Sequence, residues 1–159
     1  SAVSRAVCSG ARLAPVCFPG GVRRPAEDPC MAYVTVINEH QHLQQIVSGH
    51  HHLTADETLA AGGSDAGLAP RELLLASLGA CTAVALRKHA AQKDWALGKI
   101  TVGVRWSRNP SGTEHIERRL SFTRPLTPEQ KTRLLEIADA TPITSVLRAG
   151  IAIQSSVVD

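Results

Sequence analysis

The sequence predicts an α+β domain built on antiparallel sheet, and three patterns carry that prediction. Residues 100–106 alternate strictly between apolar and polar side chains, which is typical of a half-buried strand. An Asn-Pro-Ser-Gly turn at residues 109–112 leads into a second strand over residues 116–122, so the two are expected to pair as a hairpin. A long apolar helix over residues 70–93 precedes this hairpin, and helix-capping motifs follow it.

The part of the chain before the long helix contains the other strand signals. Residues 33–37 are short and β-branched, which predicts a strand, and residues 43–47 are expected to return beside it. Residues 58–70 are rich in Gly, Ala and Ser and are expected to form a loop. Pro70 then suits the first turn of the helix, where its missing N–H group costs nothing.

Capping motifs mark the elements that follow the hairpin. Thr127 and Gln130 form a capping box, with Pro128 at the first helical position, and open an amphipathic helix. Thr141 is expected to cap a second short helix that ends at Gly150. The apolar residues between 151 and 158 predict a final strand.

The long helix indicates a second copy of the chain. No charged side chain occurs from Leu73 to Leu86, so the helix is apolar on every face and needs cover on all sides. It is too short to span a bilayer, which takes about 20 apolar residues. One small sheet does not cover such a helix, so we expect a homodimer in which sheets from two chains enclose it.

Length and charge exclude several classes of protein. The 159 residues suit one domain, by the prior of roughly 100–200 residues per domain. The net charge of +3 comes mostly from residues 1–30, so neither nucleic acid nor a membrane is expected as a partner. Residues 1–30 have no sustained periodicity and lack the apolar core of a secretory signal. We expect them to be a disordered or non-native leader before a domain over residues 31–159, with Met31 as the natural start.

The four cysteines divide between these two parts of the chain. Cys8, Cys17 and Cys30 lie in the leader, and Cys81 alone lies in the domain. This is not a disulfide framework, and no Cys-x-x-Cys pair is present to hold zinc or do thioredoxin-like chemistry. A single domain cysteine favours a reducing compartment, so we expect a cytoplasmic protein. From composition alone Cys81 is either an inert core residue or a nucleophile kept from bulk water.

Several separated motifs occur in order from about Ala32 to the C-terminus. The most specific is the run Pro-Arg-Glu-Leu-Leu-Leu-Ala-Ser-Leu-Gly-Ala-Cys-Thr-Ala at residues 70–83. The others are His51-x-Leu53-x-Ala55-Asp56-Glu57, Gly62-Gly63, Asp65-x-Gly67, Lys93-Asp94-Trp95, and residues 134–139 with Pro142. Together they resemble the OsmC/Ohr family, the osmotically induced and organic-hydroperoxide-resistance proteins. The resemblance implies antiparallel sheets packed around a long buried cysteine-bearing helix, in an intertwined homodimer with its site at the interface.

The resemblance implies a thiol-dependent peroxidase with Cys81 as its nucleophile. A Cys81 thiolate would attack the O–O bond of an organic hydroperoxide and become sulfenic acid. Glu72 would orient the activating group, and His51, within the 50–52 histidine cluster, would supply it. Nine residues at 100° each place Glu72 about 180° from Cys81, so they meet only if the helix breaks at Gly79 or if Glu72 reaches the partner chain. Alternatively, Glu72 simply favours the helix dipole.

Two departures from the family pattern bear on this chemistry. No Lys or Arg occurs from Pro25 to Pro70, where the family's activating arginine usually lies, although Arg71 or Arg87 are conceivable substitutes. Thr141 stands where the family has a second cysteine, and it is a good helix cap rather than a redox group. Cys81 sulfenic acid would therefore need an external thiol reductant.

Two other hypotheses follow from these departures and from the histidines. The first is a catalytically inactive protein of this fold that binds an apolar small molecule or an electrophile at the dimer interface. The second is a metal site made by His40, His42, His50 and His52 if their two segments pair as a hairpin, against the expectation of surface histidines. The first expectation remains that the protein needs neither a metal nor another cofactor.

Overall fold

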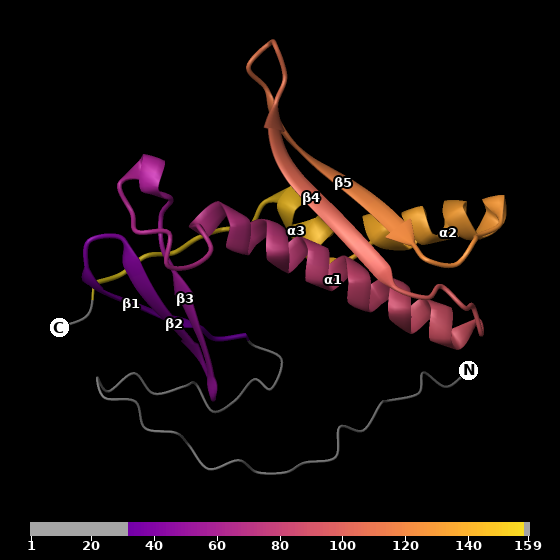
Figure 1. Ribbon diagram of the computed structural model, residues 1–159, viewed down its shortest axis with the longest axis horizontal. Coiled ribbons are helices and arrows are strands. Elements are labelled where there is room, and N and C mark those ends of the chain that lie inside the picture. Colours follow the sequence, from indigo (N-terminus) through magenta and orange to yellow (C-terminus); the bar gives the residue numbers. More distant parts are fainter. Residues whose placement is uncertain (1–31, 158–159) are drawn as a thin grey trace. The chain divides into compact units, whose positions relative to one another are not determined.

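The computed structural model describes residues 32–157, which divide into two compact units between Gly67 and Leu68 (Figure 1). The extension expected at residues 1–30 lies outside the described residues. The first unit contains β1 (Thr35–His40), β2 (Leu43–Ser48), β3 (His51–Ala55) and the 3₁₀ helix η1 (Leu59–Ala61). The second contains α1 (Pro70–Gln92), β4 (Ile100–Arg108), β5 (Glu114–Phe122), α2 (Pro128–Asp139) and α3 (Pro142–Ala149).

The first unit is a three-stranded antiparallel sheet in the order β1-β2-β3. Its β3 is a strand that sequence analysis did not assign. Ser48 pairs with His51, so only Gly49 and His50 separate β2 from β3. Gly49 has a φ of +62°, which a glycine adopts without strain and which a tight two-residue hairpin requires.

Asp56 organises the loop between β3 and the end of the first unit. The carboxylate is buried and accepts hydrogen bonds from the Ser64 hydroxyl (2.6 Å) and from the backbone N–H groups of Glu57, Ser64 and Ala66. The Ser64 hydroxyl is the largest of the influences that lower the pKa of Asp56 to about 2. A Cβ atom at Gly63 would collide with the Glu57 carbonyl, so the loop closes this tightly only with glycine there.

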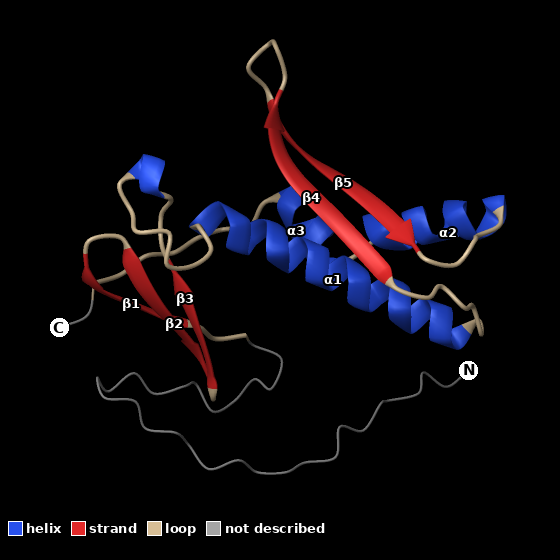
Figure 2. Ribbon diagram, viewed as in Figure 1, coloured by secondary structure: helices blue, strands red, loops and turns tan. Residues whose placement is uncertain are grey.

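The second unit packs α1 across the β4–β5 hairpin and beside α2 and α3 (Figure 2). The buried residues of α1 are four apart, which places them on one face of the helix. Partly buried side chains from β4, β5 and α2 complete the core around them. The fully buried members of this core are Leu86, Ala90, Leu97, Leu134 and Ala138.

Among residues 32–157, the opposite face of α1 is exposed: Val84 on that face is aliphatic and yet 53% exposed. Leu74, one turn before the buried Leu78, is 36% exposed. The cover that an all-apolar helix was expected to need is therefore present on one side only. The helix also runs unbroken through Gly79, so the break that would let Glu72 meet Cys81 within one chain does not occur.

The predicted caps of α2 and α3 are confirmed. Thr127 Oγ1 accepts from the Gln130 backbone N–H, and the Gln130 side chain accepts from the Thr127 N–H, which is the reciprocal capping box. Thr141 Oγ1 accepts from the Thr144 N–H at the start of α3. The β4–β5 hairpin is confirmed too, with Ile100 opposite Phe122 and Trp106 opposite Ile116.

The final strand expected over residues 151–158 is wrong for residues 151–157. These residues form no strand and are exposed, with Ile153 87% accessible. A strand needs the edge of another strand to satisfy its backbone groups. Within the described part of the chain none pairs with this segment, so its apolar pattern alone does not make it a strand.

We predict that Leu86→Ala lowers the free energy of unfolding by about 2–5 kcal/mol, because it opens a cavity in the core of the second unit. Leu86 is fully buried, whereas Leu135 on α2 is 58% exposed. Leu135→Ala is therefore the matched control, with an expected cost below about 0.5 kcal/mol. Urea denaturation followed by circular dichroism measures both, and equal losses would contradict the described core.

We predict that Asp56 makes stability depend on acid pH. Because folding lowers the pKa of Asp56 from 3.8 to about 2, its contribution is complete above about pH 4 and is lost as the pH falls towards about 2. The melting temperature should therefore drop over this window, and less steeply in Asp56→Asn, which does not titrate. Parallel curves for the two proteins would show that Asp56 does not hold the loop.

Candidate functional site

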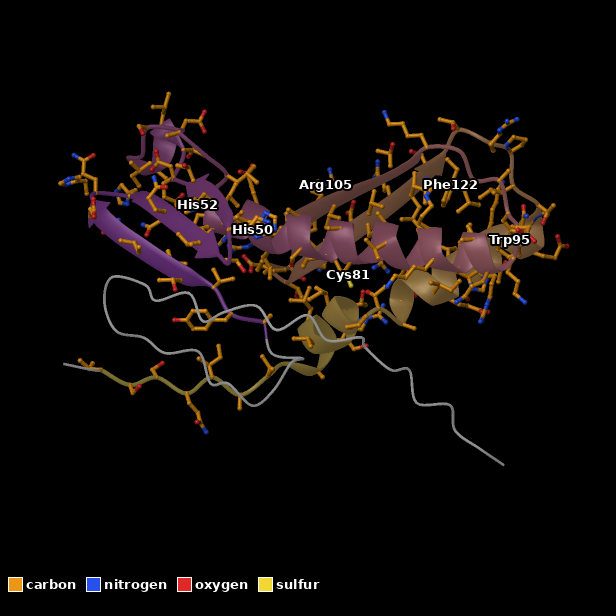
Figure 3. All side chains as sticks on the ribbon, turned by 90° about the horizontal axis from the view of Figure 1, so that it is seen from below. His50, His52, Cys81, Trp95, Arg105 and Phe122 are labelled. Carbon is orange, nitrogen blue, oxygen red and sulfur yellow. The ribbon has the colours of Figure 1, made fainter. Side chains whose placement is uncertain are left out.

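Cys81 is a free, half-buried thiol in the middle of α1 and the only cysteine among residues 32–157. Figure 3 shows its side chain leaving α1 on the side where α3 lies. Among residues 32–157 no side chain or backbone group forms a hydrogen bond with its sulfur. Within these residues the thiol therefore has no direct hydrogen-bonding partner.

Sequence analysis missed a largely buried cation, Arg118, that bonds to this part of α1. Arg118 lies on β5 in the half-buried phase of the strand, between Ile116 and Leu120, and its side chain is only 13% exposed. Arginine is rarely buried without partners. The sequence does contain one signal for this buried polar site: Arg118 occupies a position of the alternating strand where an apolar residue is expected.

The Arg118 guanidinium joins β5 to all three helices of the second unit. Its Nη1 donates to Thr82 Oγ1 on α1 (3.1 Å) and to Thr144 Oγ1 on α3 (3.0 Å). Its Nη2 donates to Asp139 Oδ1 at the end of α2 (2.8 Å). We call Arg118, Thr82, Asp139 and Thr144 the Arg118 junction. Thr82 follows Cys81 directly, so the junction holds the turn of α1 that carries the thiol.

The hydroxyl groups of the junction are oriented by backbone carbonyls. Thr82 donates to the carbonyl of Leu78 (2.8 Å), and Thr144 donates to that of Ala138 (3.1 Å). Both oxygens are thereby left to accept from Arg118. Each of these buried hydroxyls has its partners, which is what makes a buried polar network stable.

Thr141, which stands where the resemblance places a second cysteine, belongs to the same network. It is 2% exposed, and its hydroxyl lies 2.7 Å from Thr144 Oγ1. Because Thr144 gives its proton to Ala138, Thr141 is the donor of this pair. Its hydroxyl thus caps α3 and extends the junction.

Together with Arg148, the Arg118 junction carries a net positive charge. Asp139 Oδ1 also accepts from Arg148 Nη2 on α3 (2.9 Å), so one carboxylate serves two guanidinium groups. Two positive charges and one negative charge leave +1. Arg148 is 63% exposed and Asp139 54%, so of the three charges that of Arg118 is the least screened by solvent.

Glu72 lies on a different face of α1 from Cys81. Its Oε2 accepts from the Ala69 N–H (2.9 Å), which closes the first turn of the helix. On an unbroken helix nine residues separate the two side chains by about 180°. Glu72 instead borders a hollow of about 300 Å³ whose other lining residues are apolar: Leu68, Leu75, Ala76, Gly79, Val102 and Val104.

His51 begins β3 in the first unit and is exposed, with its neighbour His50 3.9 Å away between ring centroids. The hairpin pairing of the two histidine segments, on which the metal hypothesis depended, is wrong. Because β2 lies between β1 and β3 and is antiparallel to both, His40 and His51 lie at opposite ends of the sheet. Residues 32–157 hold no group of three side chains suited to a metal ion.

The two arginines considered as substitutes for the family's activating arginine have other contacts. Arg71 lies over the Trp106 ring, 5.2 Å from its centroid, and Arg87 donates to the Gly98 carbonyl (2.7 Å). Neither forms a hydrogen bond with Cys81 within the described residues. Over the same residues, no helix has both the length and the apolar character that crossing a membrane requires.

Comparison with known proteins bears on the fold and the family. The family model described as OsmC-like protein matches residues 62–156. The OsmC-like protein from Mycoplasma pneumoniae superposes with a TM-score of 0.65 at 18% identity, covering 77% of this chain and 91% of that one. The organic hydroperoxide resistance protein OhrB of Bacillus subtilis gives a TM-score of 0.52 at 24% identity, covering 76% and 92%. No curated protein matches the sequence.

We predict that Thr144→Val lowers the free energy of unfolding by about 1–3 kcal/mol, because it leaves the Arg118 guanidinium and the Thr141 hydroxyl each short of a buried partner. Thr132→Val is the control, since Thr132 on α2 is exposed and donates only to the Pro128 carbonyl. Chemical denaturation compares the two variants. Equal stability would mean that the junction does not hold α3.

Proposed function

Because the chain belongs to the OsmC-like protein family, we propose that it is a thiol-dependent peroxidase that reduces organic hydroperoxides through Cys81. The family supports this proposal, as do relatives of similar fold that are named organic hydroperoxide resistance proteins, one from Legionella pneumophila and one from Bacillus subtilis. The observation that carries it is the free, half-buried Cys81 thiol on a turn of α1 that Arg118 holds through Thr82, the next residue. An apolar helix surface around the thiol suits an alkyl or aryl peroxide.

The reaction has two steps. The Cys81 thiolate attacks the outer peroxide oxygen, the O–O bond breaks, and an alcohol leaves after taking a proton, so that Cys81 becomes sulfenic acid. An external thiol then condenses with the sulfenic acid to a mixed disulfide and releases water. A second external thiol restores Cys81. This route requires no second cysteine in the domain, and a reducing cytoplasm would supply the thiols.

The functional unit in this proposal is a homodimer. Because Glu72 and Cys81 lie on opposite faces of an unbroken α1, Glu72 would serve the site of the partner chain. The exposed aliphatic face of α1 and the exposed apolar residues of 151–157 support such an assembly, since a second copy would cover them. His51 keeps its proposed role as an activating group.

A second candidate function is the binding of an apolar small molecule without peroxidase activity. The hollow of about 300 Å³ on the Glu72 face of α1 favours it, because its lining is aliphatic except for one carboxylate. The absence of a hydrogen bond to the Cys81 sulfur, within residues 32–157, favours it as well. The two candidate functions differ in whether Cys81 is oxidised and reduced again in a catalytic cycle.

We predict that the protein consumes cumene hydroperoxide rapidly with dithiothreitol as reductant, and that Cys81→Ser reduces the rate to the background of the reductant. Stopped-flow measurement gives both rates. A Cys8/Cys17/Cys30→Ser triple variant is the control and should keep the wild-type rate, since it retains Cys81. Consumption no faster than that of free cysteine would contradict the peroxidase proposal and direct attention to a bound ligand.

A further inference from the structure

We infer that Arg118 is a positioning residue for Cys81: it supplies the positive charge that favours the thiolate and fixes the helical turn that carries it. The inference deepens the proposed function and rests on it for the biological use of the thiolate. Thiolate reactivity itself is measurable without any peroxide, so the two claims are tested separately.

The first step is the burial of Arg118 compared with the other ion-paired arginines. A cysteine acts as a nucleophile in its thiolate form, which a nearby positive charge stabilises. Residues 32–70 contain no Lys or Arg. In the second unit the ion-paired arginines other than Arg118 have side chains that are 55–83% exposed, against 13% for Arg118. Charges near the interior are screened least by water and salt.

The second step is the connection to the thiol. Arg118 Nη1 lies 3.1 Å from Thr82 Oγ1, and the Cα atoms of Cys81 and Thr82 are about 3.8 Å apart, as in any trans peptide. The guanidinium is therefore anchored to the residue next to the nucleophile. Its bonds to Thr144 and Asp139 fix it on the other side.

The third step is the charge balance, which gives the inference a distinctive signature. Arg118 and Arg148 share the single carboxylate of Asp139, for a net charge of +1. Removing the Arg118 charge lowers this to zero and should make the Cys81 thiolate harder to form. Removing the Asp139 charge raises it to +2 and should make the thiolate easier to form. If Arg118 had a purely structural role, the two substitutions would not affect formation of the Cys81 thiolate in opposite directions.

Other titratable groups near this part of α1 set the conditions of the test. Lys88 and His89 lie on α1 itself, and β5, α2 and α3 contribute Arg118, Asp139 and Arg148. Lys88 and His89 are the same in every variant compared, so a difference between two curves reports on the substituted arginine or on Asp139.

The test is the rate of Cys81 alkylation by iodoacetamide as a function of pH, in a Cys8/Cys17/Cys30→Ser background. Arg118→Met should move the midpoint of the curve up by about one pH unit, and Asp139→Asn should move it down. Arg118→Lys keeps the charge and should restore most of the midpoint. Arg133→Met is the control, because it breaks only the exposed Arg133–Glu136 pair on α2 and should leave the midpoint unchanged.

The outcomes separate the hypotheses. Shifts of the same sign in Arg118→Met and Asp139→Asn, or no shift in Arg118→Met, would overturn the inference. If Arg118→Met does not fold, the comparison of Asp139→Asn with Arg133→Met decides, since only the first should lower the midpoint. Opposed shifts in a protein that consumes no hydroperoxide would refute the peroxidase function and leave the role of Arg118 standing.

Discussion

The second unit is organised by the requirement that one half-buried guanidinium find partners for its donors. Arg118 occupies an apolar phase of β5, where an unpaired charge would be strongly destabilising. Thr82, Thr144 and Asp139 meet this requirement from three different helices. The position of α3 and the corner between α2 and α3 follow from the same contacts. Cys81 is held where it is because its neighbour in the chain belongs to this junction.

The continuity of α1 separates two chemical surfaces on one helix. One side carries Cys81, the chain neighbour of Thr82 in the Arg118 junction, and the other carries Glu72 beside an aliphatic hollow. A single chain therefore does not bring the thiol and this carboxylate together. A site that uses both needs two chains, which is why the proposed peroxidase is a homodimer. Thr141 closes the network beside α3, so the proposed catalytic cycle depends on an external thiol.

Sequence reasoning succeeded where the signals are local. The apolar run of α1, the alternation of β4 and the capping boxes of α2 each lie within a few residues, and each predicted its element. It missed β3, whose opening histidines conceal the alternation, because the strand depends on the tight turn at Gly49. It failed for residues 151–157 because alternating apolar residues do not ensure that a neighbouring strand is there to pair with.

The candidate site was only partly predictable for the same reason. Cys81 is visible as the one cysteine of the domain, but the partners of Arg118 come from positions 82, 139 and 144. No local pattern links such distant residues. The sequence shows an arginine in an apolar phase, and only the packing of α1, α2 and α3 shows what it binds. Whether Glu72 can reach Cys81 within one chain likewise depends on whether α1 breaks at Gly79. The residue types alone do not decide this.

The most direct test of this account is the intact mass of the full chain after one equivalent of cumene hydroperoxide, followed by peptide mapping with dimedone present. The account predicts one dimedone adduct, located on Cys81, because a sulfenic acid forms there and has no second domain cysteine with which to condense. An unmodified Cys81, with oxygen added instead to Met31 or to the cysteines of residues 1–30, would contradict it.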